Sequence, residues 1–341
     1  MNNRLKNALY SLALLLLVFA VWKYRQSHSV NEIKIGGETM GTTYHITYYD
    51  KGARNFKAQV DSLLLAFNQS LSTYIKSSEV SGFNSGKAFV FHLPYFLPVL
   101  EKSQEVTSLS NGAFDPTVMP LVNAWGFGPG KKLMPDSARI DSIMGFVGFE
   151  KIHFNSDSVW KEDARVQLDF SAIAKGYGVD VVAGYLKSMG VADWFVEIGG
   201  EVSAFGKNQK LNKPWEAGIL DPASTYASQS YKAYVQLENK AMATSGNYFN
   251  FYEEDGKKFS HTIDPVTGYT IRHELLSASV FAKDCMTADA WATAFMVMGR
   301  KRAIRKLEQI RELDAFLIYS TENGIETFST NGIKPMVSIN P

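Results

Sequence analysis

The chain has 341 residues, 45% of them hydrophobic and 20% charged, so it can bury a substantial core and is not disordered throughout. Its formal net charge of +1 gives no electrostatic basis for binding nucleic acid. Because Cys285 is the single cysteine, an intramolecular disulfide is excluded, and disulfides do not indicate the compartment.

An apolar run over residues 8–22 lies near the amino terminus, with Arg4 and Lys6 before it and Lys23 and Arg25 after it. The run has roughly 15 residues, which is short for a membrane span of about 20 but compatible with a signal-anchor. Because basic residues flank both ends, the positive-inside rule does not orient the segment.

We expect two parts: a signal-anchor or transmembrane segment over residues 1–29, and one folded body over residues 30–341. Small residues at cleavage spacing are missing after Phe19, and no cysteine is available there for lipid attachment. An uncleaved anchor is therefore favoured over a cleaved signal. The body is expected on the periplasmic or outer side of the cytoplasmic (inner) membrane.

Residues 30–49 are rich in β-forming residues, and glycines surround Met40. Met40 is either a plug in the core, which the sequence favours, or a soft surface against a flat ring. Residues 53–71 have helical spacing and lead into a polar, turn-rich stretch. Tyr74 in that stretch is either a stacking platform for a ligand or an ordinary exposed tyrosine.

Residues 97–110 are predicted to form an amphipathic helix that ends at Asn111-Gly112. Asp115 follows, between Phe114 and Pro116, which is an unusual setting for a carboxylate. It is either the cap of a turn or a ligand contact.

The stretch over residues 167–200 is predicted to contain a strand ending at Asp169, a helix to about Ser188 and a second strand over residues 195–198. Ser171 is the expected N-cap. We expect residues 201–206 to extend the second strand.

Lys175, Gly176 and Gly178 lie at the start of this helix. A helix start offers free N–H groups to an anion, and the lysine adds a positive charge. The glycines either let a ligand approach the backbone or relieve packing between elements.

Short helical and hairpin signals cover residues 140–166, and further strands are predicted over residues 215–222 and 231–237. His261 precedes the turn signals Asp264-Pro265 and Thr267-Gly268. A single histidine is usually structural, so its position alone assigns no role.

Residues 284–299 are predicted to form a buried helix, because they are apolar nearly all round. Asp289 and Thr293 are four residues apart and share one face of that helix. A buried carboxylate needs a cation or strong donors. Lys175 and a hard metal such as Mg²⁺ are both candidates, with the metal slightly favoured.

Strands are interleaved with few helices, which predicts an α+β fold rather than a doubly wound sheet. The sequence contains no histidine/cysteine metal cluster, P-loop or G-x-S-x-G motif. Metalloprotease, P-loop NTPase and serine-hydrolase functions therefore have no support.

Nine segments of the sequence resemble the ApbE family, the FAD:protein FMN transferases, and they follow one another in the order found in that family. They cover about residues 38–299 and read ETMGTTYHITYY, LSTYIKSSEVSGFN, NGAFDPTVMPLV, LDFSAIAKGYGVD, EIGGEV, WEAGILDP, ATSGNY, HTIDPVTG and CMTADAWATA. Each is weak alone, but their common order is specific. The resemblance implies an ApbE-like, T-fold-like α+β body of mixed or antiparallel sheets.

The resemblance also implies a reaction. FAD would lie in a cleft with Mg²⁺ at its pyrophosphate, FMN would pass to a threonine hydroxyl of a partner protein, and AMP would leave. The implied acceptors are flavin-carrying subunits of membrane redox complexes, of the sodium-translocating NADH:quinone reductase or Rnf type.

Site residues follow from the same resemblance by position. The metal ligands would be the carbonyl of Ala172, Asp289 and Thr293, with Ala174 left open as an alternative to Ala172. Ser171-Ala172 departs from a family pattern that often has two glycines. The implied FAD contacts are Met40, Tyr74, Ala113, Phe114, Asp115, Asp169, Lys175, His261 and Ile263.

Phosphoryl transfer needs charge neutralisation more than covalent help, which Mg²⁺ and Lys175 would supply. His261 is the candidate base for the acceptor hydroxyl, and Asp289 is an alternative only if it is not committed to metal. Competing functions are an FAD pyrophosphatase that uses water, a non-catalytic FAD-binding protein, and a structural protein.

Overall fold

The computed structural model describes residues 3–28, 30–128, 135–224, 228–247, 251–254, 257–260 and 262–340. Within them, one antiparallel sheet of eight strands dominates. Its strands, in spatial order, are β1 (Asn31–Thr39), β2 (Thr42–Asp50), β6 (Trp194–Ile198), β7 (Glu201–Phe205), β10 (Lys240–Gly246), β13 (Leu275–Ala282), β14 (Asp314–Thr321) and β15 (Gly324–Ser329).

Smaller antiparallel units surround the main sheet. They are the sheet β16 (Val337–Ile339), β9 (Tyr231–Leu237) and β8 (Trp215–Leu220); the sheet β3 (Ala88–Val90), β5 (Ser158–Lys161) and β4 (Ile152–Phe154); and the hairpin β11 (Phe251–Glu254) with β12 (Lys257–Ser260).

Helices are distributed along the chain between these strands. They are α1 (Asn3–His28), α2 (Lys57–Leu71), α3 (Glu79–Ser85), α4 (Phe96–Leu109), α5 (Met119–Trp125), α6 (Ser137–Met144), α7 (Ala174–Ser188), α8 (Cys285–Met298) and α9 (Arg300–Leu307), with 3₁₀ turns η1 (Pro116–Val118), η2 (Phe149–Lys151) and η3 (Lys334–Met336).

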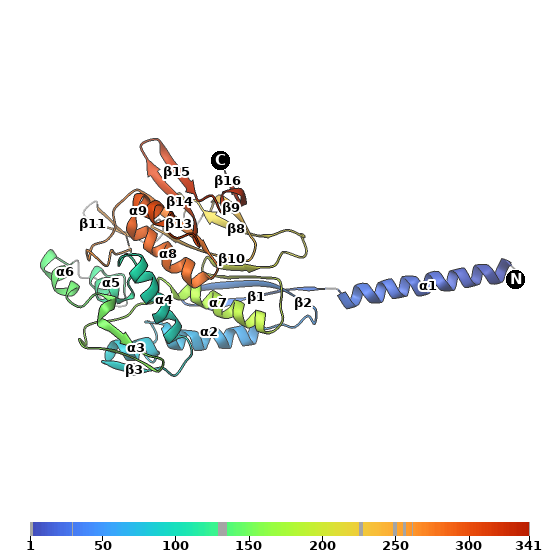
Figure 1. Cartoon of the computed structure of the whole chain (residues 1–341), viewed down its shortest axis with the longest axis horizontal. Helices are drawn as coiled ribbons and strands as arrows, with labels where there is room; N and C mark the ends of the chain where they lie inside the picture. The colour runs from blue at the N-terminus through green and yellow to red at the C-terminus, as the bar shows by residue number, and fades with distance from the viewer. Residues whose placement is uncertain are drawn as a thin grey trace.

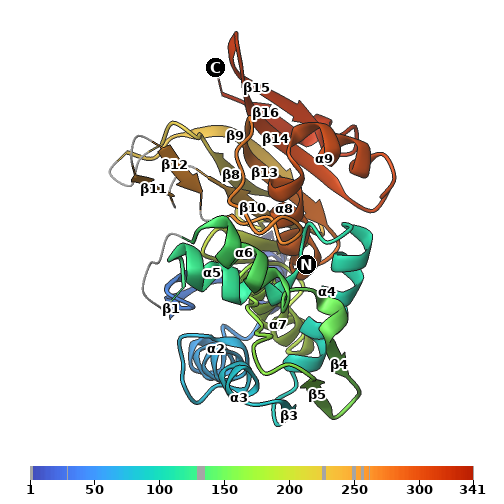
Figure 2. The same ribbon diagram turned by 90° about the vertical axis from the view of Figure 1, so that its left-hand side faces the viewer.

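The main sheet separates two cores. One face packs against α7 and α8, which lie side by side with α2 and α4 around them (Figure 1). The other face packs against the sheet β16-β9-β8. Seen from the end, α2 to α6 gather on one side of the molecule and the C-terminal strands on the other (Figure 2).

Strand β14 shows why the sheet is covered on both faces. Ala315, Leu317 and Tyr319 belong to the helical core, whereas Phe316 and Ile318 belong to the core under the small sheet. Successive side chains of a strand point to opposite faces, so a continuous apolar run requires a covering layer on each side. The predicted α+β body with antiparallel sheets is confirmed.

Three details of the central stretch differ from the sequence prediction. Residues 166–170 form no strand, because the N–H of Asp169 donates to the carbonyl of Pro116 at 2.7 Å instead of joining a sheet. The N-cap position is Ile173 rather than Ser171, whose hydroxyl bonds to Asp169. Residues 201–205 form a separate strand, β7, which folds back on β6.

The tight turn between β6 and β7 explains that last difference. Gly199 and Gly200 adopt φ angles of 59° and 99°, which disfavour residues with a side chain. The two glycines reverse the chain and bring Glu201, the first residue of β7, opposite Ile198.

Helix α1 extends away from the body (Figure 1), and its apolar side chains from Leu9 to Phe19 are largely exposed. Among the described residues, no helix combines the length and the apolar character needed to cross a membrane. The anchor predicted over residues 1–29 stays a prediction.

Candidate active site

The start of α7 and the first turns of α8 are in direct backbone contact. A Cβ atom on Gly176 would lie 2.2 Å from the carbonyl oxygen of Cys285 and 2.7 Å from the Cβ of Asp289. No side chain fits there, so the glycine is required for packing. Of the two roles considered for Gly176, the structure supports close packing of helices.

Asp289 is held at this contact. It is 3% exposed, and its Oδ2 accepts a hydrogen bond of 2.9 Å from the backbone N–H of Gly176. Burial raises the pKa of Asp289, although the positive charge of Lys175 and the Gly176 N–H oppose the shift. A carboxylate in this position gains from a nearby cation.

Lys175 does not supply that cation by direct pairing. Among the described ion pairs its partner is Glu201, with Nζ 2.5 Å from Oε1, and the Glu201 side chain is only 2% exposed. Burial opposes the charge on Lys175, but Glu201 and Asp289 together raise its pKa, so the ammonium form persists at neutral pH. Burial raises the pKa of Glu201 to about 7, although Lys175 opposes the shift.

Thr293 lies one turn further along α8, and its Oγ1 is 3.2 Å from the hydroxyl oxygen of Ser245 on β10. Carboxylate, hydroxyl and carbonyl oxygens are the ligands that Mg²⁺ prefers. The described residues contain no group of three or more His, Cys, Asp or Glu side chains that could hold a metal. Asp289 and Thr293 therefore fit a hard ion only together with backbone or substrate oxygens.

The carbonyl of Ala172 is suited to such a role. The N–H of Gly176, four residues further on, donates to Asp289 and not to Ala172. Ala174, in contrast, is the first residue of α7, and its carbonyl points along the helix toward later N–H groups.

Met40 packs from the β1–β2 turn onto the same helix. It has a φ of 52°, in the left-handed region, and its methyl group would be 2.5 Å from a Cβ on Gly178. Met40 is partly buried against the helical core, in agreement with the core plug favoured by the sequence.

The segment Ala113–Asp115 is buried, with Ala113 and Phe114 exposed by no more than 2%. Asp115 caps η1: its Oδ1 accepts hydrogen bonds from the N–H and hydroxyl of Thr117, and its Oδ2 accepts one from Phe149 N. Burial raises its pKa against these donors. The turn-cap role is thus present, and FAD contact by this segment is a prediction.

Two other predicted FAD contacts lie at the surface or near it. Tyr74 is 72% exposed and lies between α2 and α3. Asp169 accepts hydrogen bonds from the N–H and hydroxyl of Ser171, which shapes the turn before α7.

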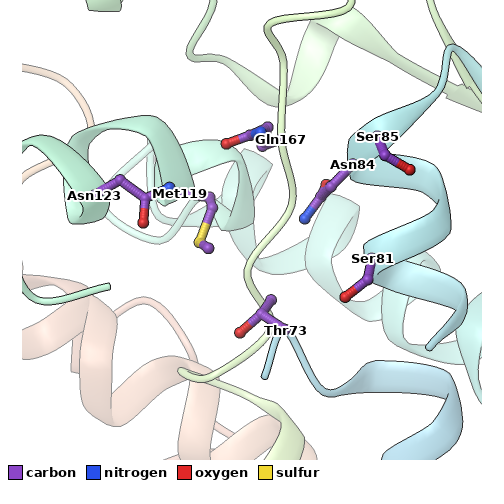
Figure 3. A pocket seen from close by; sticks show the side chains of 7 residues that line it. All are labelled: Thr73, Ser81, Asn84, Ser85, Met119, Asn123 and Gln167. Carbon is purple, nitrogen blue, oxygen red and sulfur yellow. The ribbon is translucent and has the colours of Figure 1, made fainter. Parts of the chain in front are cut away.

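A cavity of about 220 Å³ lies next to these segments (Figure 3). Its lining is uncharged and comes from Thr73, Ser81, Asn84, Ser85, Met119, Asn123 and Gln167. Within the described part of the chain, Asn123 Oδ1 is buried and has no hydrogen-bond partner. Asn84 is instead fully engaged, because its amide bonds to both N–H and C=O of Leu168. The Asn123 oxygen is not exposed in the cavity, because it lies against the backbone of Gly128.

The remaining predicted residues lie around the 264–268 turn. Ile263 is 5% exposed and packs in a core with α5 and α6. Trp125 Nε1 donates to the carbonyl of Gly268 at 2.9 Å, which ties this turn to α5. His261 lies outside the described residues.

Sequence reasoning missed two carboxylates of the site. Glu201, the partner of Lys175, was part of the quoted EIGGEV segment but received no role. Asp180 of α7 accepts hydrogen bonds of 2.8 Å from the backbone N–H groups of Cys285 and Met286. Neither contact has a sequence signal, because each partner lies far along the chain.

Known proteins with similar sequences agree with this architecture. The ApbE family model matches residues 40–317. An FAD:protein FMN transferase of Vibrio cholerae is 36% identical over 343 residues, covering 98% of this chain and 100% of the relative. One from Haemophilus influenzae is 37% identical over 318 residues, covering 89% and 91%.

Solved structures give the same result. The flavin transferase ApbE from Vibrio cholerae superposes with a TM-score of 0.81 at 35% identity, covering 90% of this chain and 100% of that one. Family match, full-length relatives and fold agree, so the chain belongs to the ApbE family.

Proposed function

We propose that the chain is an FAD:protein FMN transferase, which moves FMN from FAD to a threonine hydroxyl of an acceptor protein and releases AMP. Full-length relatives of that name support the assignment. The observation that carries it is a buried carboxylate, Asp289, which accepts the N–H of Gly176 at the start of α7, next in sequence to the cationic Lys175. Charge neutralisation at this point suits cleavage of a pyrophosphate.

Asp289, Thr293 and the carbonyl of Ala172 would hold a Mg²⁺ ion. When bound, the ion supplies positive charge that polarises the pyrophosphate and stabilises the departing phosphate. The hard oxygen donors and the need of the buried Asp289 for a cation support this proposal.

Lys175 binds and orients the diphosphate. Its ammonium group has three donors, and Glu201 takes one of them, so others remain for phosphate oxygens. Its side chain is 33% exposed, whereas that of Glu201 is 2% exposed, so the pair presents its cation outward. The ion pair therefore fixes the position of the charge that the substrate meets.

The neutral cavity is proposed to take one ring system of FAD. Both the isoalloxazine and the adenine ring carry N–H donors and ring-nitrogen acceptors, and the uncharged polar lining, which includes the amide of Asn123, suits hydrogen bonds to either. Thr73 and Gln167 line the cavity. In the sequence, Thr73 is next to Tyr74, and Gln167 is two residues before Asp169.

His261 is proposed as the base that removes the proton of the acceptor threonine. This role follows from the place of His261 in the HTIDPVTG segment of the family resemblance. Replacement of His261 by alanine is expected to slow FMN transfer strongly while FAD binding persists. Transfer at the wild-type rate by that variant would remove the assignment.

The acceptor is proposed to be a flavin-carrying subunit of a membrane redox complex, of the sodium-translocating NADH:quinone reductase or Rnf type. We also propose that residues 1–29 attach the body to the cytoplasmic membrane, with the body on its outer side. The exposed apolar side chains of α1 support attachment.

The test uses the full-length chain in mild detergent with FAD, Mg²⁺ and a candidate acceptor domain. A denaturing gel is examined for flavin fluorescence on the acceptor band. A band that requires both Mg²⁺ and the acceptor threonine is the expected result. Free FMN and AMP without a labelled band would instead show hydrolysis, and intact FAD would contradict catalysis.

A further inference from the structure

Helices α7 and α8 are joined by a carboxylate that the catalytic assignment does not use. Asp180 of α7 accepts hydrogen bonds of 2.8 Å from the N–H groups of Cys285 and Met286, the first two residues of α8. The first N–H groups of a helix have no partner within it, so an outside acceptor is strongly favoured there.

The position of Asp180 on α7 makes this contact more than a helix cap. Gly176 precedes it by four residues, so the two share one face of α7. On that face, the Gly176 backbone lies against the Cys285 carbonyl, and the Gly176 N–H holds Asp289. The two helices therefore meet at two successive turns, with the carboxylate of Asp180 at one and the backbone of Gly176 at the other.

The backbone N–H, the carbonyl and the thiol of Cys285 each make a contact within this region. Its N–H is bound by Asp180, its carbonyl packs on Gly176, and its thiol points to the carbonyl of Met242 on β10 at 3.6 Å. Asp289 lies one turn later on the same helix. A shift of the first turn of α8 thus displaces Asp289 relative to Lys175.

We propose that Asp180 is a positioning residue for the reaction: by binding the first turn of α8 to α7, it holds Asp289 in place relative to the start of α7, where the Ala172 carbonyl lies, and so sets the affinity of the metal site. This inference rests on the proposed function, since it concerns the site that would hold Mg²⁺. Asp180 acts through Asp289 and does not touch the metal or FAD.

Asp284 provides a matched control. Its side chain accepts a hydrogen bond from the N–H of Thr287, so it caps the same helix end from the residue before α8, and among the described residues it makes no hydrogen bond to α7. Asp180→Asn and Asp284→Asn each remove one negative charge near the same helix start. Asparagine remains a good N-cap at position 284. At position 180 its amide nitrogen cannot accept the second N–H.

The experiment is calorimetric titration of Mg²⁺ into the full-length, FAD-free protein at pH 8, followed by steady-state transfer assays. Asp180→Asn is expected to raise the Kd for Mg²⁺ about tenfold, as is typical when a group that orients a metal ligand is lost. The Mg²⁺ concentration for half-maximal rate should rise in parallel, while KM for FAD at saturating Mg²⁺ changes less than about twofold. Asp284→Asn should leave the Kd within about twofold of wild type.

Equal Kd values for Asp180→Asn and wild type would overturn the proposal, and so would equal losses in Asp180→Asn and Asp284→Asn. Failure of the wild type itself to bind Mg²⁺ is a different result, because it contradicts the metal site of the proposed function.

A second measurement needs no variant and serves if Asp180→Asn does not fold. If the hydrogen bonds of Asp180 to the first turn of α8 strengthen Mg²⁺ binding about tenfold, thermodynamic linkage requires bound Mg²⁺ to stabilise these hydrogen bonds by the same factor. Amide hydrogen exchange at Cys285 and Met286 of the wild type should then slow about tenfold on addition of Mg²⁺. Unchanged exchange at these two amides, with Mg²⁺ bound, would contradict the role of Asp180.

Discussion

Two polar regions of the body differ in whether their polar side chains have hydrogen-bond or ion-pair partners within the protein. At the α7–α8 contact, Lys175 pairs with Glu201, and Asp289 accepts the Gly176 N–H. In the cavity near α3 and α5, the lining is neutral, and Asn123 Oδ1 lacks a partner among the described residues. The charged region is preorganised within the protein, which suits catalysis, whereas the neutral one has binding capacity left for a ligand.

The largest effect is expected from Asp289→Ala at the charged contact. Loss of the buried carboxylate should abolish Mg²⁺ binding and lower kcat/KM by at least about 100-fold. Calorimetric titration with Mg²⁺ and initial transfer rates provide the measurement. Wild-type Mg²⁺ affinity and turnover in this variant would remove Asp289 from the site, and Asp289→Asn separates loss of charge from loss of volume.

The next effect concerns the close approach of the two helices. Gly176→Ala places a Cβ 2.2 Å from the Cys285 carbonyl, so we expect the free energy of unfolding to fall by about 2 kcal/mol. Gly184→Ala in the same helix meets no atom within 4 Å and should raise it by about 0.5–1 kcal/mol. Denaturant titration of both variants is the measurement; equal changes of the same sign would contradict the packing role of Gly176.

In the cavity we expect a smaller effect, on FAD binding rather than on stability. Asn123→Ala removes a buried acceptor without a partner, so the FAD-free protein should not lose stability. KM for FAD should rise about tenfold with kcat within about twofold, because one hydrogen bond to the ring is lost.

Ser85→Ala is the control for the cavity. Ser85 lines the same space, but its hydroxyl already bonds to the carbonyl of Gly82. KM for FAD should therefore change little. A fall in kcat for Asn123→Ala, or equal KM values for the two variants, would show that the cavity does not take the ring.

The last prediction concerns how stability depends on pH through Asp180, the carboxyl group that bonds α7 to the first turn of α8. Withdrawal from water raises the pKa of Asp180 to about 7 against the two N–H donors, and Asp284 and Asp289 of α8 add to the shift. An unfolded aspartate has a pKa of about 4, so between the two pKa values the folded state binds a proton that the unfolded state has lost. The contribution of Asp180 to stability is fully present below its pKa in the unfolded state and is lost as the pH rises through its pKa in the folded state.

As the pH rises from about 4 to 7, the titration of Asp180 should therefore lower the free energy of unfolding by up to about 1.4 kcal/mol per pH unit. Glu201, whose pKa is also about 7, acts in the same direction. The difference between wild type and Asp180→Asn, measured by denaturant titration at several pH values, isolates the contribution of Asp180. A difference that does not vary with pH would show that this carboxyl titrates normally.

The sequence alone determined the elements whose signals are local. Helix α8 follows from an apolar run that starts after Asp284, and strand β9 from the alternation of apolar residues at Ala233, Val235 and Leu237. The family resemblance added the class of reaction and the prediction that Asp289 and Thr293, which share one face of α8, bind a metal. Each of these signals needs only neighbours within a turn or two.

Only the tertiary structure decided the partners of the charged groups. Lys175 pairs with Glu201 rather than Asp289, Asp180 binds the first amides of α8, and the peptide of Asp169 bonds to Pro116 instead of a strand. These contacts join residues far apart in the chain, and their energies depend on burial and exact distance. No local pattern encodes such distances, because they arise when the helices and the main sheet pack together.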